Sequence, residues 1–271
     1  MRNFGVGGAR VSKVSRKPYS KTPEYEAALK FQPDIVVIAL GINDTSINEW
    51  RQNSDIFKQD YLEIIGRFKG LESKPKVYIT TLMPVFVPYR HYLEIQPNIR
   101  QAQILIKQIG DIAQLDVIDL YSPLETEPSI YSRDGLHPSK EGAEIIAKTI
   151  FNAITGDFGG LKLAGIFGDN MIIQRDMPIK IWGIADSGNL VIVKFAGRNK
   201  ITTADINGRW LVEFEPLSEG SLMSLKVTSL SKTIEIKNIV IGDVWLCSGQ
   251  SNMAWQFKQD GNYLSEKQDT D

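Results

Sequence analysis

The chain has 271 residues, of which 42% are hydrophobic and 23% charged, and its formal net charge is -1. These values describe an ordinary globular protein with one large domain or two modest ones. The near-zero charge offers no electrostatic footprint for nucleic acid or for an anionic membrane, so a small or neutral substrate is expected. A single cysteine, Cys247, excludes an internal disulfide. No apolar run approaches the roughly 18 residues of a membrane span, and the N-terminal residues lack the features of a signal peptide.

The first half of the chain alternates strand and helix patterns. Its apolar runs are continuous, which is typical of strands covered on both faces. Strict alternation with helices predicts a parallel sheet with right-handed crossovers. Residues 1–5 are interpreted as the tail of a further short strand. Buried strands are predicted at 34–40, 76–82 and 115–120, and helices at 22–30, 54–70, 98–114 and 140–154.

Two turns of this half lie where ligands bind in related architectures. The Gly-rich stretch that ends at Gly8 lets a ligand approach the backbone closely. It lacks the third glycine or alanine of a dinucleotide-binding fingerprint, so a structural turn is the alternative. Asn43 and Asp44 follow a buried strand, at the edge where open α/β sheets place their ligands. Taken alone, either residue would be interpreted as a helix N-cap.

The two histidines differ in their surroundings. His91 falls in a loop punctuated by prolines and is interpreted as a solvated loop residue. His137 follows Asp134 by three residues at the mouth of a predicted helix. A histidine held by an aspartate can take a proton from a hydroxyl nucleophile and return it to a leaving group. The alternative is that Asp134 caps a turn and His137 supports the loop.

The second half has a different pattern. From Asp157 to Lys237 short β-branched and aromatic runs are separated by turn signals, among them Asn207-Gly208, a strong hairpin signal. This pattern predicts a small antiparallel β-sandwich domain. Trp182 and Trp210 are assigned to its core, with a sugar-stacking platform as the alternative.

A last apolar run, residues 239–247, is interpreted as another buried strand. It leads into Ser248-Gly249-Gln250-Ser251-Asn252 and the start of a helix. A serine at a strand-to-helix turn is exposed at the sheet edge, where backbone N–H groups can bind an oxyanion. The alternative for Ser251 is an N-cap. Cys247 is expected to be a small buried hydrophobe.

Three stretches of the first half resemble the second, third and fifth sequence blocks of the SGNH (GDSL-like) hydrolase superfamily. They are Asn3–Gly8, Gly41–Asp44 and Asp134–Pro138. The resemblance implies a flavodoxin-like, three-layer α/β fold with a parallel sheet. It also implies that Gly8 and Asn43 help to bind the oxyanion, and that Asp134 and His137 complete a catalytic triad. No metal and no cofactor are implied, and the family's opening strand and Gly-Asp-Ser block are expected to precede residue 1.

From about Leu161 the chain resembles the bacterial sialate O-acetylesterases instead. The similar stretches are 167–175, 178–183 and 241–253. This resemblance implies that Ser251 is the serine nucleophile and that Gln250 and Asn252 contact the substrate. It also implies a periplasmic or secreted parent protein. The chain is then expected to be an internal piece of a tandem esterase.

Three parts are therefore expected. Residues 1–156 form an SGNH domain without its first strand, 157–238 a β-sandwich domain, and 239–271 the first strand and nucleophile block of an SGNH domain. The absent strand is central in the order 2-1-3-4-5, so its loss would leave two unpaired edges. We expect residues 239–247 to fill this gap, within one chain or by strand exchange in a homodimer. That closure would bring Ser251 beside His137.

The predicted function is a carbohydrate O-acetylesterase of the sialate type, a serine hydrolase acting on small O-acetylated carbohydrates. A rival enzyme interpretation is a lipase or thioesterase of the same superfamily. A rival of another class is a catalytically inactive glycan-binding or structural fragment.

Overall fold

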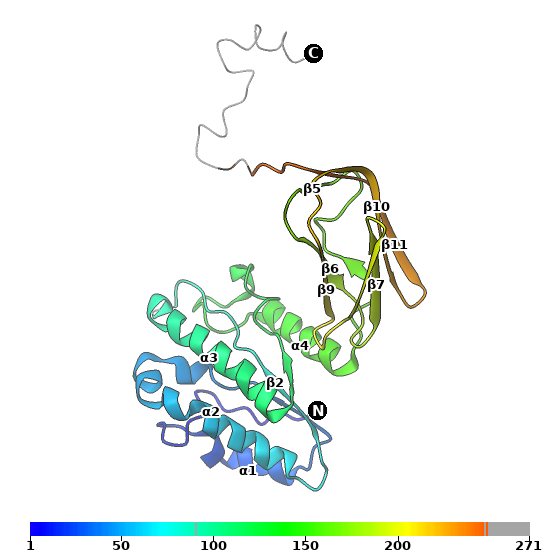
Figure 1. Ribbon diagram of the computed structural model, residues 1–271. Helices are drawn as coiled ribbons and strands as arrows, with labels where there is room; N and C mark the ends of the chain where they lie inside the picture. The colour runs from blue at the N-terminus through cyan, green and yellow to red at the C-terminus, as the bar shows by residue number, and fades with distance from the viewer. Residues whose placement is uncertain (90, 247, 249–271) are drawn as a thin grey trace, which may run out of the picture.

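The computed structural model describes residues 1–89, 91–246 and 248. Figure 1 shows an α/β part at the N-terminal side and a β-rich part beyond helix α4. The helices are α1 (Pro23–Lys30), α2 (Ile47–Lys69), α3 (Tyr92–Ala113) and α4 (Lys140–Thr155), with short 3-10 turns η1 (Tyr19–Lys21), η2 (Ile42–Thr45) and η3 (Pro128–Ile130). The strands are β1 (Ile35–Ile38), β2 (Lys76–Thr80), β3 (Asp116–Ile118), β4 (Lys162–Leu163), β5 (Ile172–Gln174), β6 (Ile179–Ile184), β7 (Leu190–Phe195), β8 (Arg198–Thr203), β9 (Arg209–Phe214), β10 (Gly220–Ser229) and β11 (Lys232–Gly242).

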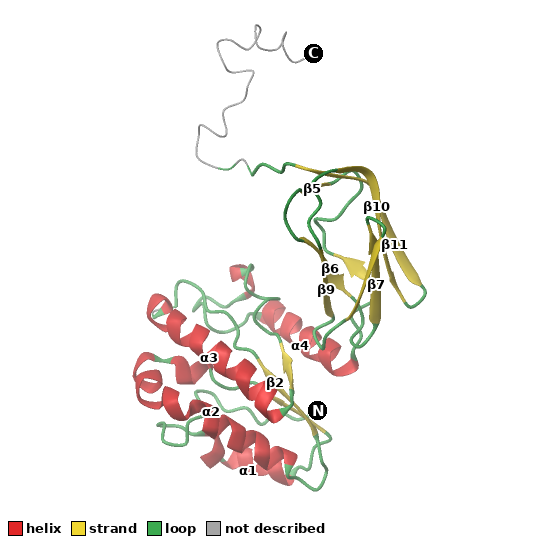
Figure 2. Cartoon of the chain, viewed as in Figure 1, coloured by secondary structure: helices red, strands yellow, loops and turns green. Residues whose placement is uncertain are grey.

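The α/β part is built on a sheet of order β1-β2-β3, and both strand pairs are parallel, as predicted. The sheet has helices on both faces (Figure 2). Val77 and Ile79 of β2 pack into one hydrophobic core with α1, α2 and α3. Tyr78, which points to the opposite face, packs into a second core with Ala153 of α4. Side chains that alternate between the two cores explain why the strand patterns are continuously apolar.

Several predicted boundaries in this part are corrected. Residues 1–5 form no strand: the Asn3 side chain accepts a hydrogen bond from the Gly5 amide at 2.8 Å, and Phe4 packs on Phe31. Helix α2 begins before the predicted residue 54, and α3 begins before residue 98 with Pro97 inside it. The polar first turn of α2 hid the start of that helix, and Pro97, the sixth residue of α3, was interpreted as a break before the helix.

The β-rich part contains a five-stranded sheet, β5-β11-β10-β7-β8, and a three-stranded sheet, β4-β6-β9. All pairs are antiparallel except β5 with β11. Both sheets contribute to one hydrophobic core. Trp210 lies in that core with 3% of its surface exposed, whereas Trp182 is 38% exposed and packs edge-on against Phe167. The core assignment is therefore wrong for Trp182, which lies on the outer face of its sheet.

The expected closure of the first sheet by residues 239–247 is wrong for residues 239–242, which end β11. Val240, Ile241 and Gly242 pair with β5, and the preceding residues of β11 form a hairpin with β10. Ile239 and Ile241 are buried in the core of the β-rich part, while Val240 is 37% exposed. This alternation suits a strand with one solvated face, and the hairpin closes through a short local turn. The expected intrachain closure and the expected strand-exchanged dimer both required this strand to be free. Its residues up to Gly242 are already paired in the β-rich part.

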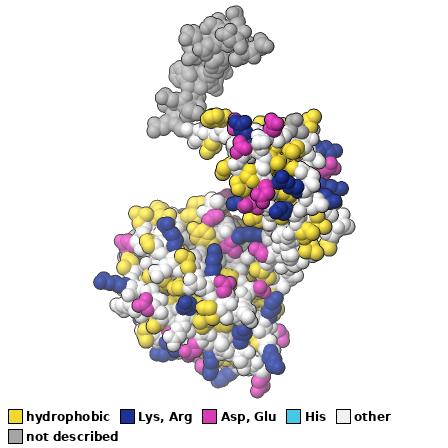
Figure 3. All heavy atoms as spheres, viewed as in Figure 1, with side chains coloured by type: hydrophobic (Ala, Val, Ile, Leu, Met, Phe, Trp, Pro, Cys, Tyr) yellow, Lys and Arg dark blue, Asp and Glu magenta, His cyan; other side chains and the backbone are white. Residues whose placement is uncertain are grey.

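The edge of β1 that faces away from β2 pairs with no strand in the described part of the chain. Ile35 on this strand is 46% exposed. None of the described helices combines the length and the apolar content needed to span a bilayer. On the face seen in Figure 3, acidic and basic side chains are interspersed, in keeping with the small net charge.

Candidate active site

The turn that carries Asp134 and His137 is closed by backbone hydrogen bonds across its base. Tyr131 and Pro138 form an antiparallel bridge, and the Ser132 amide donates to the His137 carbonyl oxygen at 2.8 Å. Gly135 has a φ of 69°, in the left-handed region. A side chain at Gly135 would collide with the Phe86 carbonyl oxygen, so this position requires glycine. The turn connects η3 to the N-terminus of α4, where the Ser139 side chain caps the helix.

Asp134 holds both the turn and the imidazole. Its Oδ1 accepts hydrogen bonds from the Leu136 and His137 amides at 2.9 and 3.0 Å, and from the Ser132 hydroxyl at 2.7 Å. Its Oδ2 lies 2.6 Å from Nδ1 of His137. The hydrogen bond to His137 and those from the turn lower the pKa of Asp134 well below its usual range. An ionised acceptor at Nδ1 fixes the tautomer that leaves Nε2 free to act as a base.

The dyad is open to solvent. The His137 side chain is 72% exposed and that of Asp134 49%. No hydrogen bond joins the Nε2 atom of His137 to any residue that the structure describes. A substrate or a nucleophile could therefore approach this nitrogen without displacing any of the described residues.

Gly8 and Asn43 come from two separate loops that meet. Gly8 has a φ of 75°, and its carbonyl oxygen accepts from the Arg10 guanidinium at 3.0 Å. The Asn43 side-chain amide, which follows β1, donates to the carbonyl oxygen of Ala9 at 3.1 Å. The structure thus brings Asn43 to the residue next to Gly8, as an oxyanion site built from both would require.

Asp44 anchors the loop that carries Gly8, a role beyond the helix cap expected from its sequence context. The residue is only 3% exposed. Its carboxylate accepts from the amides of Val11 at 3.0 and 3.1 Å and of Ser12 at 3.1 Å. Burial raises the pKa of Asp44 to about 6, and the hydrogen bonds and Arg10 oppose this only in part. The signal for this role is a carboxylate directly after Asn43 at the end of a buried strand.

The described residues supply two pairs, Asp134 with His137 and Gly8 with Asn43. Asn43 follows β1, and the turn with Asp134 and His137 lies in the connection from β3 to α4, whereas no strand precedes Gly8. Leu136, Val6 and Ile42 pack against the same hydrophobic core. No hydrogen bond among the described residues joins one pair to the other. Ser251, Gln250 and Asn252, like Cys247, lie outside the described residues. His91 is at the N-cap of α3, where Nδ1 lies 2.9 Å from Glu94.

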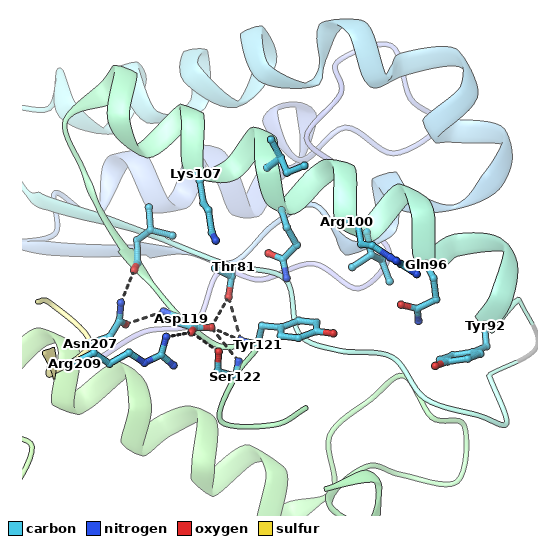
Figure 4. Close-up of a pocket in the computed structure, with 14 residues that line it drawn as sticks. Thr81, Tyr92, Gln96, Arg100, Lys107, Asp119, Tyr121, Ser122, Asn207 and Arg209 are labelled. Atoms are coloured by element: carbon cyan, nitrogen blue, oxygen red, sulfur yellow. Dashed lines mark hydrogen bonds and ion pairs between the residues drawn. The ribbon is translucent and has the colours of Figure 1, made fainter. Parts of the chain in front are cut away.

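A polar cluster at the joint between the two parts was not anticipated from the sequence. Asp119, just after β3, receives hydrogen bonds from Ser122 and an ion pair from Arg209 of β9 at 2.7 Å (Figure 4). The Asn207 side chain accepts from the Asp119 amide at 2.9 Å and donates to the Val117 carbonyl at 3.2 Å. Asn207 was noted only as part of a hairpin turn. Its partners lie about 90 residues away in the chain, where no local pattern reports them.

Comparisons with known proteins match parts of this chain. A family model described as GDSL-like lipase/acylhydrolase matches residues 1–145. An acetylxylan esterase from Xylanibacter ruminicola is 29% identical over 174 residues, which cover 57% of this chain and 35% of that protein. A sialate O-acetylesterase from Mus musculus is 28% identical over 122 residues, which cover 41% of this chain and 23% of that protein.

Among solved structures, a GDSL-like lipase from Bacteroides thetaiotaomicron is 25% identical, with a TM-score of 0.41 over 48% of this chain and 66% of that one. The chain spans well under half the length of the acetylxylan esterase and the sialate O-acetylesterase that it matches.

Proposed function

Because the chain belongs to the GDSL-like lipase/acylhydrolase family, we propose that it is a carbohydrate O-acetylesterase, a serine hydrolase that removes acetyl groups from sugar hydroxyls. The proposal includes sialate-type O-acetyl esters among its substrates. It is supported by relatives that are an acetylxylan esterase and a sialate O-acetylesterase. The observation that carries it is the 2.6 Å contact between His137 Nδ1 and Asp134 Oδ2, which leaves Nε2 open to a nucleophile.

The proposed reaction is acyl transfer through Ser251. The hydroxyl oxygen of Ser251 attacks the acetyl carbonyl carbon while Nε2 of His137 takes the hydroxyl proton. The Gly8 amide and the Asn43 side chain stabilise the negative charge on the carbonyl oxygen. As the ester bond breaks, His137 gives its proton to the departing sugar oxygen. Water then attacks the acetyl-serine while His137 takes its proton, and His137 returns that proton to the Ser251 oxygen as the bond to the acetyl group breaks and acetate is released.

The position of β11 changes how Ser251 would reach His137. Residues 239–242 are paired in the β-rich part, so the proposal does not place them in the first sheet. The nine residues from Asp243 to Ser251 can span up to about 30 Å when extended. Gln250 and Asn252 flank the serine, and we assign them contacts with the sugar.

One structural observation favours a rival proposal, a catalytically inactive glycan-binding or structural piece. The edge of β1 has no strand partner in the described residues, and β11 is paired inside the β-rich part. A site with displaced groups loses much of its rate, since an error of about 1 Å can cost roughly 100-fold. This rival predicts a folded protein without turnover.

Hydrolysis of p-nitrophenyl acetate by the full chain separates these proposals. We expect turnover that disappears in Ser251→Ala and in His137→Ala, and that persists in the matched variant Ser248→Ala. Absence of turnover in the folded wild-type chain would support the inactive rival. A p-nitrophenyl ester series tests the lipase alternative, which predicts faster hydrolysis of octanoate than of acetate. Release of acetate from acetylated xylooligosaccharides and from O-acetylated sialic acid then identifies the sugar.

A mixing experiment tests whether two chains share one site. Ser251→Ala retains His137, and His137→Ala retains Ser251. If the nucleophile comes from a partner chain, the mixture of these two inactive variants regains activity. If the site forms within one chain, the mixture stays inactive.

A further inference from the structure

A long groove lies on the α/β part beside the joint with the β-rich part. Its volume is about 780 Å³. One wall is α3, and the other is formed by Asn207, in the turn before β9, and Arg209, the first residue of β9 (Figure 4). Lining residues on α3 run from Tyr92 to Lys107. At a rise of 1.5 Å per residue this wall is about 22 Å long. The groove therefore suits an extended chain better than a single small molecule.

The groove carries uncompensated positive charge. Arg100 and Lys107 both line it, both are exposed, and neither forms an ion pair with any residue that the structure describes. The one carboxylate in the lining, Asp119, is already neutralised by Arg209 at 2.7 Å. Arg100 and Lys107 are two helical turns apart, which places them about 10 Å from each other along α3. Two free cations at this spacing favour a ligand with more than one negative group.

The remaining lining favours a ligand rich in hydroxyl groups. Tyr92 and Tyr121 contribute aromatic rings, and no hydrogen bond joins either hydroxyl to another described residue. The Gln96 amide nitrogen donates to the Val85 carbonyl, so its oxygen stays available to a ligand. Ile104 is the one exposed large hydrophobic side chain in the described lining, with 58% of its surface exposed. Rings with polar tips suit a sugar, which has both apolar faces and hydroxyl edges.

The edge of β3 beside the groove is closed to peptide strands. A peptide that added to this sheet would need the backbone groups of the edge strand. The Asn207 side chain already accepts from the Asp119 amide and donates to the Val117 carbonyl oxygen. Ile104 is the one exposed large hydrophobic side chain in the described lining, so an amphipathic helix would find few apolar contacts for its anchor residues. The two common modes of peptide recognition are therefore disfavoured at this groove.

We propose that this groove is a binding site for an oligosaccharide that carries carboxylate groups, separate from the dyad. Its Tyr92 end is tied to the dyad's turn: the Tyr92 amide donates to the Tyr89 carbonyl, and the Phe86 amide donates to the Gly135 carbonyl at 2.8 Å. A glycan held along α3 would thus point one end toward the loop that contacts Gly135, between Asp134 and His137. The choice of a glycan as the ligand rests on the proposed function. The expectation that the ligand is negatively charged rests on Arg100 and Lys107 and is independent of that function.

Isothermal titration calorimetry of the full chain tests this site without an activity assay. The probe is tetragalacturonate, with neutral xylotetraose as its uncharged counterpart. We expect tetragalacturonate to bind more tightly, and its affinity to fall about tenfold in the double variant Arg100→Gln, Lys107→Gln. The matched control, Arg51→Gln with Lys148→Gln, removes two exposed charges outside the groove and should leave the affinity unchanged. Raising the salt concentration should weaken binding to the wild type.

The contrary outcomes are distinct. Equal loss of affinity in both double variants would place the site elsewhere, and no binding would overturn the proposal. Equal affinity for inorganic phosphate would reduce it to a simple anion site, and equal affinity for a tetra-aspartate peptide would overturn the choice of a glycan. Calorimetry measures binding directly. Absence of esterase activity in the wild-type chain would therefore refute the proposed function without changing the binding result.

Discussion

The guanidinium of Arg209, on β9, lies 2.7 Å from the carboxylate of Asp119, at the end of β3. This ion pair joins the β-rich part to the α/β part. The Asp119 carboxylate also accepts from the Tyr121 and Ser122 amides, which begin the connection from β3 to the dyad's turn. A single carboxylate thus fixes both the joint and the start of the loop that carries Asp134 and His137.

Arg209→Ala should destabilise the protein by about 1–3 kcal/mol, because it leaves the largely buried Asp119 carboxylate without its cationic partner. The Asp119 side chain is only 15% exposed. The free energy of unfolding, measured by urea denaturation, gives the effect. Arg198→Ala, on the exposed strand β8, is the matched control and should change little. An equal effect of both substitutions would show that the ion pair contributes nothing.

The ion pair between Asp119 and Arg209 should make the free energy of unfolding depend on pH in the acidic range. Burial opposes ionisation of Asp119, but hydrogen bonds from Ser122 and the charge of Arg209 outweigh it and lower its pKa below 3.8. A lowered pKa in the folded state stabilises the protein above the ordinary value, and this contribution is lost as pH falls through the folded-state pKa. Asp119→Asn should therefore reduce the loss of stability on acidification below about pH 4. An unchanged acid limb in this variant would contradict the assignment.

Asp44 should produce the opposite pH dependence at higher pH. Its pKa is raised by burial to about 6 in the folded protein, so the folded state holds a proton that the unfolded state has already released. The free energy of unfolding should fall as pH rises from about 4 to 6, by up to about 3 kcal/mol. Asp44→Asn should lack this fall, and the exposed Asp111→Asn should retain it. A constant difference between wild type and Asp44→Asn across this range would refute the assignment.

Gly135→Ala should cost more stability than Gly160→Ala. Both glycines have positive φ, of 69° and 73°, so each substitution pays the left-handed penalty of about 1 kcal/mol. Only at Gly135 would the new methyl group meet a backbone atom, the Phe86 carbonyl oxygen, whereas nothing lies near the position at Gly160. Differential scanning calorimetry compares the two. Equal shifts in Tm would mean that the contact with Phe86 imposes no constraint.

Asp134→Asn should lower kcat by about 10³–10⁴-fold without unfolding the turn, because the asparagine oxygen can still accept the turn's amides but cannot orient Nδ1 of His137. The Asp134 and His137 side chains are 49% and 72% exposed, so Tm should stay close to that of the wild type. Asp157→Asn is the control, since Asp157 likewise accepts a local amide, that of Gly159 at 2.9 Å. Unchanged kcat in Asp134→Asn would remove the dyad from the mechanism.

Features set by local pattern were predictable from the sequence. The parallel order of the strands follows from the alternation of strand and helix patterns, and the Asp134 and His137 pair follows from its spacing. A shared role for Asn43 and Gly8 was expected from the family resemblance. The GDSL-like family, suspected from three such motifs, is confirmed by the match over residues 1–145.

Features that depend on tertiary competition were not predictable. The apolar run that begins at Ile239 was interpreted as a buried strand of the first sheet. Its first residues pair instead with β10 and β5. Its pattern fits either sheet, and only the hairpin turn next to it decides between them. The side chain of Asn207 that seals the edge of β3 is likewise invisible to pattern reasoning, because its partners are distant in the chain.

Labelling with a fluorophosphonate tests the central claim most directly, because this reagent reacts with a serine that a neighbouring base activates. Mass spectrometry of the digested full chain should find the adduct on Ser251 in the wild type. The same adduct should be absent in His137→Ala and strongly reduced in Asp134→Asn. An adduct on Ser251 that forms equally well without His137, or none in the folded wild-type chain, would contradict the account.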